Sequence, residues 1–179
     1  IKKSDNYKIS PHTGHNISDY LSYIIDNYDN LPKEIGFIKG SIYPRHITKE
    51  LFESRINETG FIPLYSDENT YKTNIQGRIC KTLIAQQTSP GLYMEIANDW
   101  YVSSSEKGRY YPTLESLFYK ITGRDLPMYI TMVPGACMVV ERNKVLKWDK
   151  NFYEDLYKSV TYKYFPVEAY HMERCMCYI

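Results

Sequence analysis

The chain has 179 residues, enough for one domain with a sizeable core. Its 22 basic and 21 acidic residues give a net charge of +1 and are well mixed along the sequence. This balance argues against a nucleic-acid partner, because a nucleic-acid surface needs a basic face. No apolar run reaches the ~20 residues of a membrane span. No signal peptide is visible either.

Tyrosine is unusually frequent, with 19 copies. Its apolar ring and polar hydroxyl suit partly solvated clefts, including those that bind sugars or bases. The alternative explanation for the high tyrosine content is a coding bias.

The four cysteines form no CxxC pair and no zinc spacing, so we expect reduced, structural thiols in a cytoplasmic protein. The chain opens on Ile1 and not on methionine, so we expect either a fragment of a longer chain or a missing start.

The strongest local pattern begins at Gly14. Apolar residues recur at the helical period and predict a helix over 18–28, with Asn16 or Ser18 as its cap and Pro32 beyond its end. The stripe consists of Ile17, Tyr20, Leu21, Ile24, Ile25 and Tyr28.

A short apolar run, Ile35–Ile38, follows this helix. Its length and composition predict an interior strand covered on both faces, as in a parallel sheet. Ligands of open α/β sheets bind beyond the carboxyl ends of the strands. Lys39, Arg45 and His46 come directly after this strand, so we expect them beside a ligand.

The rest of the chain alternates between helical and strand patterns, which favours an α/β fold. We predict a single domain over 1–179 with a mostly parallel or mixed central sheet flanked by helices. The expected helices cover 49–56 after Thr48, 75–87, 113–123, 143–159 with a break near Asp149, and 167–179 after Pro166. The expected strands cover 61–64 (at a sheet edge), 92–96, 100–102, 128–133 and 136–140.

No complete catalytic motif is present, because GxGxxG, P-loop and GxSxG patterns are all missing. The pair Arg45–His46 places a fixed cation beside a titratable imidazole, which suits phosphate binding or proton transfer; the alternative is a solvated loop. Asp99 could hold a divalent metal or a sugar hydroxyl, or it is an ordinary turn residue. Asp67–Glu68 is a second possible metal site, with a solvated loop as its alternative.

The last predicted helix carries His171, Glu173 and Arg174. His171 and Arg174 are three residues apart and share a face, whereas Glu173 points elsewhere. With this much charge we expect the helix to be only partly buried, either as an ordinary amphipathic helix or lining a cleft. We expect Arg174 to tether the helix through a carboxylate or carbonyl groups.

Two stretches resemble known families. Residues 14–40 resemble the N-terminal signature of an uncharacterised domain-of-unknown-function family from fungi, algae, bacteria and large viruses. The matching segments are Tyr20–Leu21, Tyr28–Pro32 and Phe37–Gly40, while His15–Asn16 replaces an Arg-Glu pair.

Residues 135–157 and 169–179 resemble the closing part of glycosyltransferase-like domains that modify capsular or surface polysaccharide. The residues that match are Gly135, Met138, Tyr170, Glu173 and Arg174.

The second resemblance implies a GT-A-like fold and a hexosyl- or deoxyhexosyltransferase. Such an enzyme moves sugar from a nucleotide-sugar donor to a hydroxyl of a glycan or glycoprotein. The Asp-x-Asp metal motif common in that fold is absent from this sequence.

The residues that we expect to carry this chemistry fall into three groups. Glu173 and His46 are the catalytic candidates, with Glu173 as the base, and Asp99 would hold Mn²⁺ or Mg²⁺. The substrate-binding candidates are Lys39, Arg45, His171 and Trp100. Because two matched stretches far apart in sequence should meet at one site, we expect Arg45 and His46 to face the same cavity as the last helix. The alternatives are a non-catalytic carbohydrate- or nucleotide-binding module, and a structural or assembly domain of a larger viral or cellular protein.

Overall fold

A computed structural model describes residues 13–66, 86–89, 91–99, 101–103 and 106–179. These segments form helices and two small sheets, so the α/β prediction is confirmed. The helices are α1 (His15–Asn27), α2 (Lys49–Arg55), α3 (Leu114–Thr122), α4 (Arg142–Val145), α5 (Lys150–Thr161) and α6 (Val167–Cys175). The strands are β1 (Glu34–Phe37), β2 (Ile62–Pro63), β3 (Gln86–Ser89), β4 (Leu92–Ile96), β5 (Tyr129–Met132) and β6 (Met138–Glu141). None of the described helices is long and apolar enough to cross a membrane.

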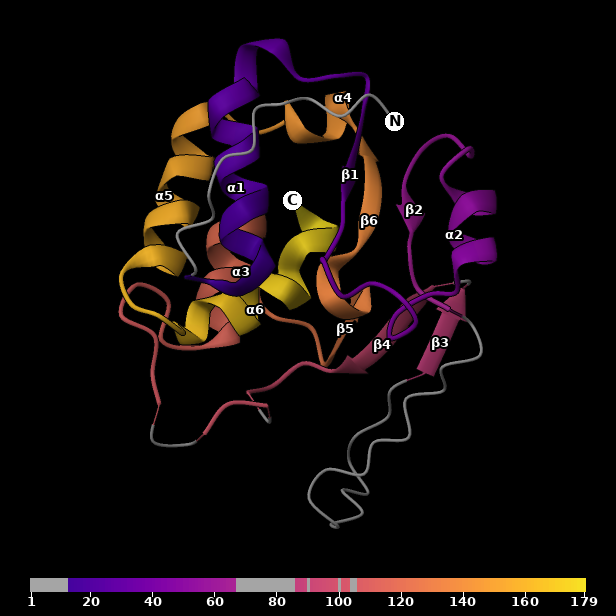
Figure 1. Ribbon diagram of the computed structural model, residues 1–179. Coiled ribbons are helices and arrows are strands. Elements are labelled where there is room, and N and C mark those ends of the chain that lie inside the picture. The colour runs from indigo at the N-terminus through magenta and orange to yellow at the C-terminus, as the bar shows by residue number, and fades with distance from the viewer. Residues whose placement is uncertain (1–12, 67–85, 90, 100, 104–105) are drawn as a thin grey trace.

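The strands form two three-stranded sheets, ordered β1-β6-β2 and β3-β4-β5, and every described pair is antiparallel. The expectation of a mostly parallel or mixed central sheet is therefore wrong. Short apolar strands look alike in sequence whichever way their neighbours run, because burial and not direction selects their residues. In Figure 1, α1, α3, α5 and α6 gather on one side of the first sheet, and α2 lies beyond β2.

The interior strand of the first sheet is β6, not β1. Among the described residues β1 pairs only with β6 and is an edge strand, and Ile38 just beyond it is 39% exposed. In β6, Met138 packs into the main core with the helices, whereas Val139 packs into a second core beneath α2. Phe37 is buried on the helical side, where its ring lies 4.8 Å from that of Tyr20. α1 therefore packs on one face of the sheet as predicted, but β1 is not covered on both faces.

Helix α6 is almost wholly buried, so the prediction of a partly buried helix is wrong. Its buried residues include Glu168, His171 and Arg174. Charged side chains enter a core only when the fold supplies partners for them. Each of the three has a partner far away in sequence, which is why the pattern of α6 alone did not predict its burial.

Several local predictions are confirmed. Thr48 caps α2 and Thr113 caps α3, which ends at the left-handed Gly123. Asp149 breaks the 143–159 region by capping α5. Two predictions are wrong: residues 101–102 form a turn, and 86–89 form a strand where the end of a helix was expected. The rest of the 75–87 helix lies outside the described residues.

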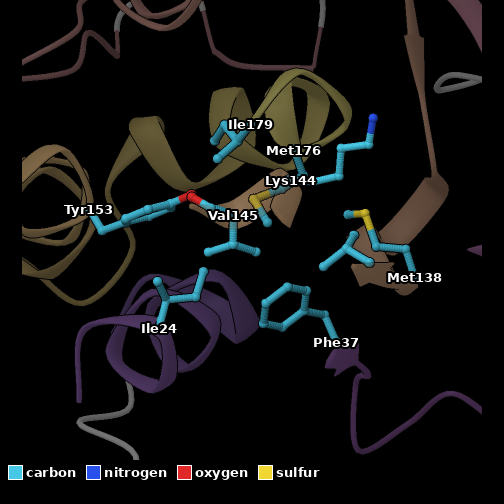
Figure 2. A pocket seen from close by; sticks show the side chains of 9 residues that line it. Ile24, Phe37, Met138, Lys144, Val145, Tyr153, Met176 and Ile179 are labelled. Carbon is cyan, nitrogen blue, oxygen red and sulfur yellow. The ribbon is translucent and has the colours of Figure 1, made fainter. Parts of the chain in front are cut away.

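The main core contains a small apolar cavity of about 30 Å³. Figure 2 shows the Val145 side chain pointing into it, facing Ile24, Phe37 and Met138. The Tyr153 hydroxyl reaches the same place and donates a hydrogen bond to the Val145 carbonyl at 2.7 Å. The space beside Val145 is therefore close to the size of one methyl group.

We expect Val145→Ile to raise the free energy of unfolding by about 0.8 kcal/mol, because the added methylene is buried in existing space. Val160→Ile is the matched control: Val160 is fully buried but does not line the cavity. Overpacking there should lower the free energy of unfolding by about 1–3 kcal/mol. Urea denaturation measures both, and equal destabilisation by the two variants would contradict this view of the cavity.

Candidate functional site

A tight turn between β5 and β6, formed by Pro134–Ala136, lies at the centre of the candidate site. Its middle residue, Gly135, has a left-handed φ of +78°. The Gly135 N–H donates to Oε1 of Glu173 at 3.0 Å, and its carbonyl accepts from Nδ2 of Asn16 at 3.2 Å. The imidazole of His46 packs against the same residue, 2.9 Å from where a Cβ would stand. This Gly135 turn therefore joins α1, α6 and the loop that follows β1.

Glu173 uses its second oxygen to reach that loop. Oε2 lies 3.5 Å from Nζ of Lys39, and both side chains are about one quarter exposed (24% and 23%). The structure thus brings Lys39, His46 and Glu173 together around the Gly135 turn. These residues lie far apart in the sequence, so the tertiary fold alone creates the cluster.

Lys39 and Arg45 line an open cavity of about 350 Å³ between the start of α1 and the loop after β1. Its other lining residues are His15, Asn16, Asp19, Tyr20, Ile38, Gly40 and Ser41. The lining mixes cations, a carboxylate and an amide, so it can both donate and accept hydrogen bonds. The Tyr20 side chain is buried at an apolar position of the α1 stripe, and burial raises the pKa of its hydroxyl.

His46 is 7% exposed and is not among the residues that line the cavity. Neither of its ring nitrogens has a hydrogen-bond partner within the described parts of the chain. Burial lowers the pKa of His46, and the positive charges of Lys39 and Arg45 lower it further, against an opposing effect of Glu173. These effects favour the neutral form of the imidazole, which packs against the Gly135 turn.

Two other sequence candidates, His171 and Asp99, meet on the opposite side of α6. Nδ1 of His171 lies 2.8 Å from the Tyr101 hydroxyl and 3.6 Å from Oδ1 of Asp99. The same Asp99 oxygen accepts the Leu114 N–H at 2.9 Å and so caps the start of α3. His171 and Glu173 are two residues apart, about 200° around a helix, and hence face different ways. The fold separates this cluster from the cavity.

Arg174 forms the most closely held ion pair of α6. Its Nε donates to Oε1 of Glu95 at 2.6 Å, and both side chains are nearly buried. The guanidinium also lies 3.2 Å from the centre of the Tyr101 ring and donates to the Tyr170 carbonyl. This geometry matches the tether expected for Arg174. The sequence held no signal for Glu95, because it sits within an ordinary strand.

Glu168 is a second buried charge of α6 that the sequence analysis missed. Its carboxylate accepts from the Tyr110 N–H at 2.8 Å and from the Tyr162 hydroxyl at 3.0 Å. It thereby holds the segment before α3 against the end of α5. Glu168, His171 and Arg174 together bind neighbouring loops and strand β4 to the buried side of α6.

The described residues contain no group of three or more His, Cys, Asp or Glu side chains that could hold a metal ion. The Asp99 carboxylate is already engaged by Leu114 and lies beside His171. These contacts do not fit a metal site built on Asp99. The remaining sequence candidates, Trp100 and Asp67–Glu68, lie outside the described residues.

Gly135→Ala should destabilise the protein, because a left-handed φ and a steric conflict with His46 act together. A matched control is Gly123→Ala, at φ +66° with nothing within 4 Å of its new Cβ. The control should cost about 1–2 kcal/mol for backbone conformation alone. Gly135→Ala should lower the free energy of unfolding by more than the control does. In a double-mutant cycle, adding His46→Ala should restore part of this additional loss. If urea denaturation shows that both alanine variants lose the same free energy of unfolding, close packing of His46 on the turn is contradicted.

Stability should depend on pH through His171. Burial lowers its pKa from 6.5 to about 4, although Asp99 and Glu168 oppose the shift. Below pH 6.5 the unfolded chain therefore binds a proton that the folded chain does not. The free energy of unfolding should fall between about pH 6.5 and 4, by up to about 1.4 kcal/mol per pH unit.

His171→Asn removes this titration and keeps a polar side chain. The variant should be less stable than the wild type at pH 7.5, and the difference should shrink toward pH 4.5. A difference that stays constant with pH would show that His171 does not titrate in this way.

Comparison with known proteins gives one match. The model of a family described as "Protein of unknown function (DUF3431)" matches residues 2–179. No curated protein and no solved structure matches the chain. Since the match covers nearly the whole sequence, the chain belongs to the DUF3431 family.

Proposed function

We propose that this protein is a glycosyltransferase that moves a sugar from a nucleotide-sugar donor to a hydroxyl of a glycan or glycoprotein. The observation that carries the proposal is that Lys39 and Arg45 line one cavity and that Lys39 also contacts Glu173 beside it. Sugar transfer needs cations for a leaving diphosphate and a base for the acceptor. The resemblance of residues 135–157 and 169–179 to glycosyltransferase-like domains supports the same activity.

In the proposed reaction, the Glu173 carboxylate takes the proton of the acceptor hydroxyl. The acceptor oxygen then bonds to the anomeric carbon of the donor sugar. The bond between that carbon and the diphosphate oxygen breaks, and its electron pair leaves with the nucleoside diphosphate. Lys39 and Arg45 stabilise the negative charge that develops on this leaving group. His46 keeps the Gly135 turn in place and so positions Glu173.

A non-catalytic carbohydrate- or nucleotide-binding module is the second candidate. One observation favours it: both oxygens of Glu173 already have partners, the Gly135 N–H and the Lys39 ammonium. A carboxylate held in this way can serve as a tether between α6 and the cavity wall. The two functions differ in what replacement of Glu173 does to turnover and to stability.

Glu173→Gln should lower the rate of transfer by a factor of about 10²–10⁴, which is the factor that general base catalysis usually contributes. The melting temperature should change little. The amide oxygen can still accept the Gly135 N–H, but the side chain can no longer take a proton. Glu115→Gln, at an exposed carboxylate on α3, is the matched control and should retain full activity. The assay follows hydrolysis and transfer of a panel of nucleotide sugars, with and without Mn²⁺, so that any requirement for a metal ion is detected.

Arg174→Ala provides a comparison on the same helix. Loss of one partner of a buried ion pair should cost about 3–5 kcal/mol of stability, with unchanged turnover per folded molecule. Normal turnover in a destabilised Glu173→Gln protein would instead remove the base assignment and favour the binding module. Absence of turnover with every donor would overturn the proposed enzyme activity.

A further inference from the structure

Four aromatic rings form an exposed cluster next to the cavity; we call them the aromatic platform. They belong to His15, Tyr164, Phe165 and Tyr170. The His15 ring lies 4.7 Å from that of Phe165 and 5.1 Å from that of Tyr170, and Tyr164 and Phe165 are 4.1 Å apart. The exposed fractions of Tyr164, Phe165 and Tyr170 are 64%, 46% and 38%. Grouped rings on a surface are typical of a binding site, whereas single exposed apolar residues are ordinary.

The platform is continuous with the cavity through His15, and Tyr170 connects it to Glu173. His15 is both the central ring of the platform and a lining residue of the cavity. Tyr170 precedes Glu173 by three residues on α6, so the two side chains are neighbours on one face of that helix. Electrostatic effects of Glu173 and Lys39 also reach the His15 imidazole. A ligand lying on Tyr170 would therefore have its edge beside the Glu173 carboxylate.

The combined surface fits the chemistry of a neutral sugar ring. A pyranose has a face of C–H bonds, which is attracted to the negative face of an aromatic ring, and a rim of hydroxyl groups. The cavity offers donors to such hydroxyls from Asn16 and Lys39 and an acceptor from Asp19, and Glu173 is a further acceptor beside Lys39. A ligand with its own negative charge would meet these carboxylates, and a wholly apolar ligand would leave the polar groups unpaired.

We propose that the aromatic platform is the subsite for the acceptor sugar, holding a neutral pyranose whose hydroxyl points at Glu173. The role as an acceptor subsite rests on the proposed glycosyltransferase activity. Sugar binding by the platform does not, and it can be measured without any donor.

The test measures binding of simple sugars by saturation-transfer NMR. The probes are the methyl glycosides of glucose, galactose, mannose and N-acetylglucosamine. We expect at least one to bind, and Phe165→Ala and Tyr170→Ala each to weaken its binding about tenfold. Tyr170→Phe keeps the ring and should bind nearly as the wild type does. Tyr119→Ala, at a tyrosine of α3 that is 59% exposed, is the matched control and should bind normally.

Two results would overturn the platform: no probe binds the wild type, or both alanine variants bind as tightly as Tyr119→Ala does. Failure of the proposed glycosyltransferase activity would give a different result. Sugar binding that depends on Phe165 and Tyr170, without turnover of any donor, would support the platform as a sugar site and remove the transfer activity. Turnover with unchanged acceptor KM in Tyr170→Ala would support the enzyme and overturn the platform as its acceptor subsite.

Discussion

The hydrogen bond from the Gly135 N–H to Glu173 is the interaction on which the arrangement of the site depends. It requires a left-handed residue at the crossing between the two sheets, and only glycine adopts that conformation freely while leaving room for a close neighbour. His46 fills the space where a side chain would stand, and Asn16 binds the carbonyl of the same residue. Three segments distant in sequence are thereby held within reach of one carboxylate.

The two sides of helix α6 have different roles. On one side, Glu168, His171 and Arg174 bind surrounding loops to the core through buried polar contacts. On the other, Tyr170 belongs to the aromatic platform and Glu173 contacts Lys39 beside the cavity. A buried, well-partnered side makes the helix rigid, and a rigid support places a functional group more reproducibly than a loop does. The polar contacts of the buried side therefore contribute to the site without lining it.

The cavity and its surroundings carry both positive and negative side chains, and these determine which ligand groups fit there. Lys39 and Arg45 suit a phosphate group, but Asp19 and Glu173 add acceptors beside them. A nucleotide sugar and a hydroxyl acceptor together carry both kinds of group, a diphosphate and a rim of hydroxyls. The nearby rings supply the apolar contact that a sugar face needs. The proposed activity and the proposed acceptor subsite draw on different parts of the same surface.

The sequence by itself determined local structure: the apolar stripe of α1, the caps at Thr48, Thr113 and Asp149, and the α/β class. These features depend on residues within a few positions of one another, so pattern and propensity are sufficient to predict them. Only the tertiary structure decided that the strands pair antiparallel, that β6 is interior, and that α6 is buried. It also brought Lys39 to Glu173 while taking Asp99 and His171 to another face. Such choices depend on contacts between distant segments, whose free energy does not appear in any local pattern.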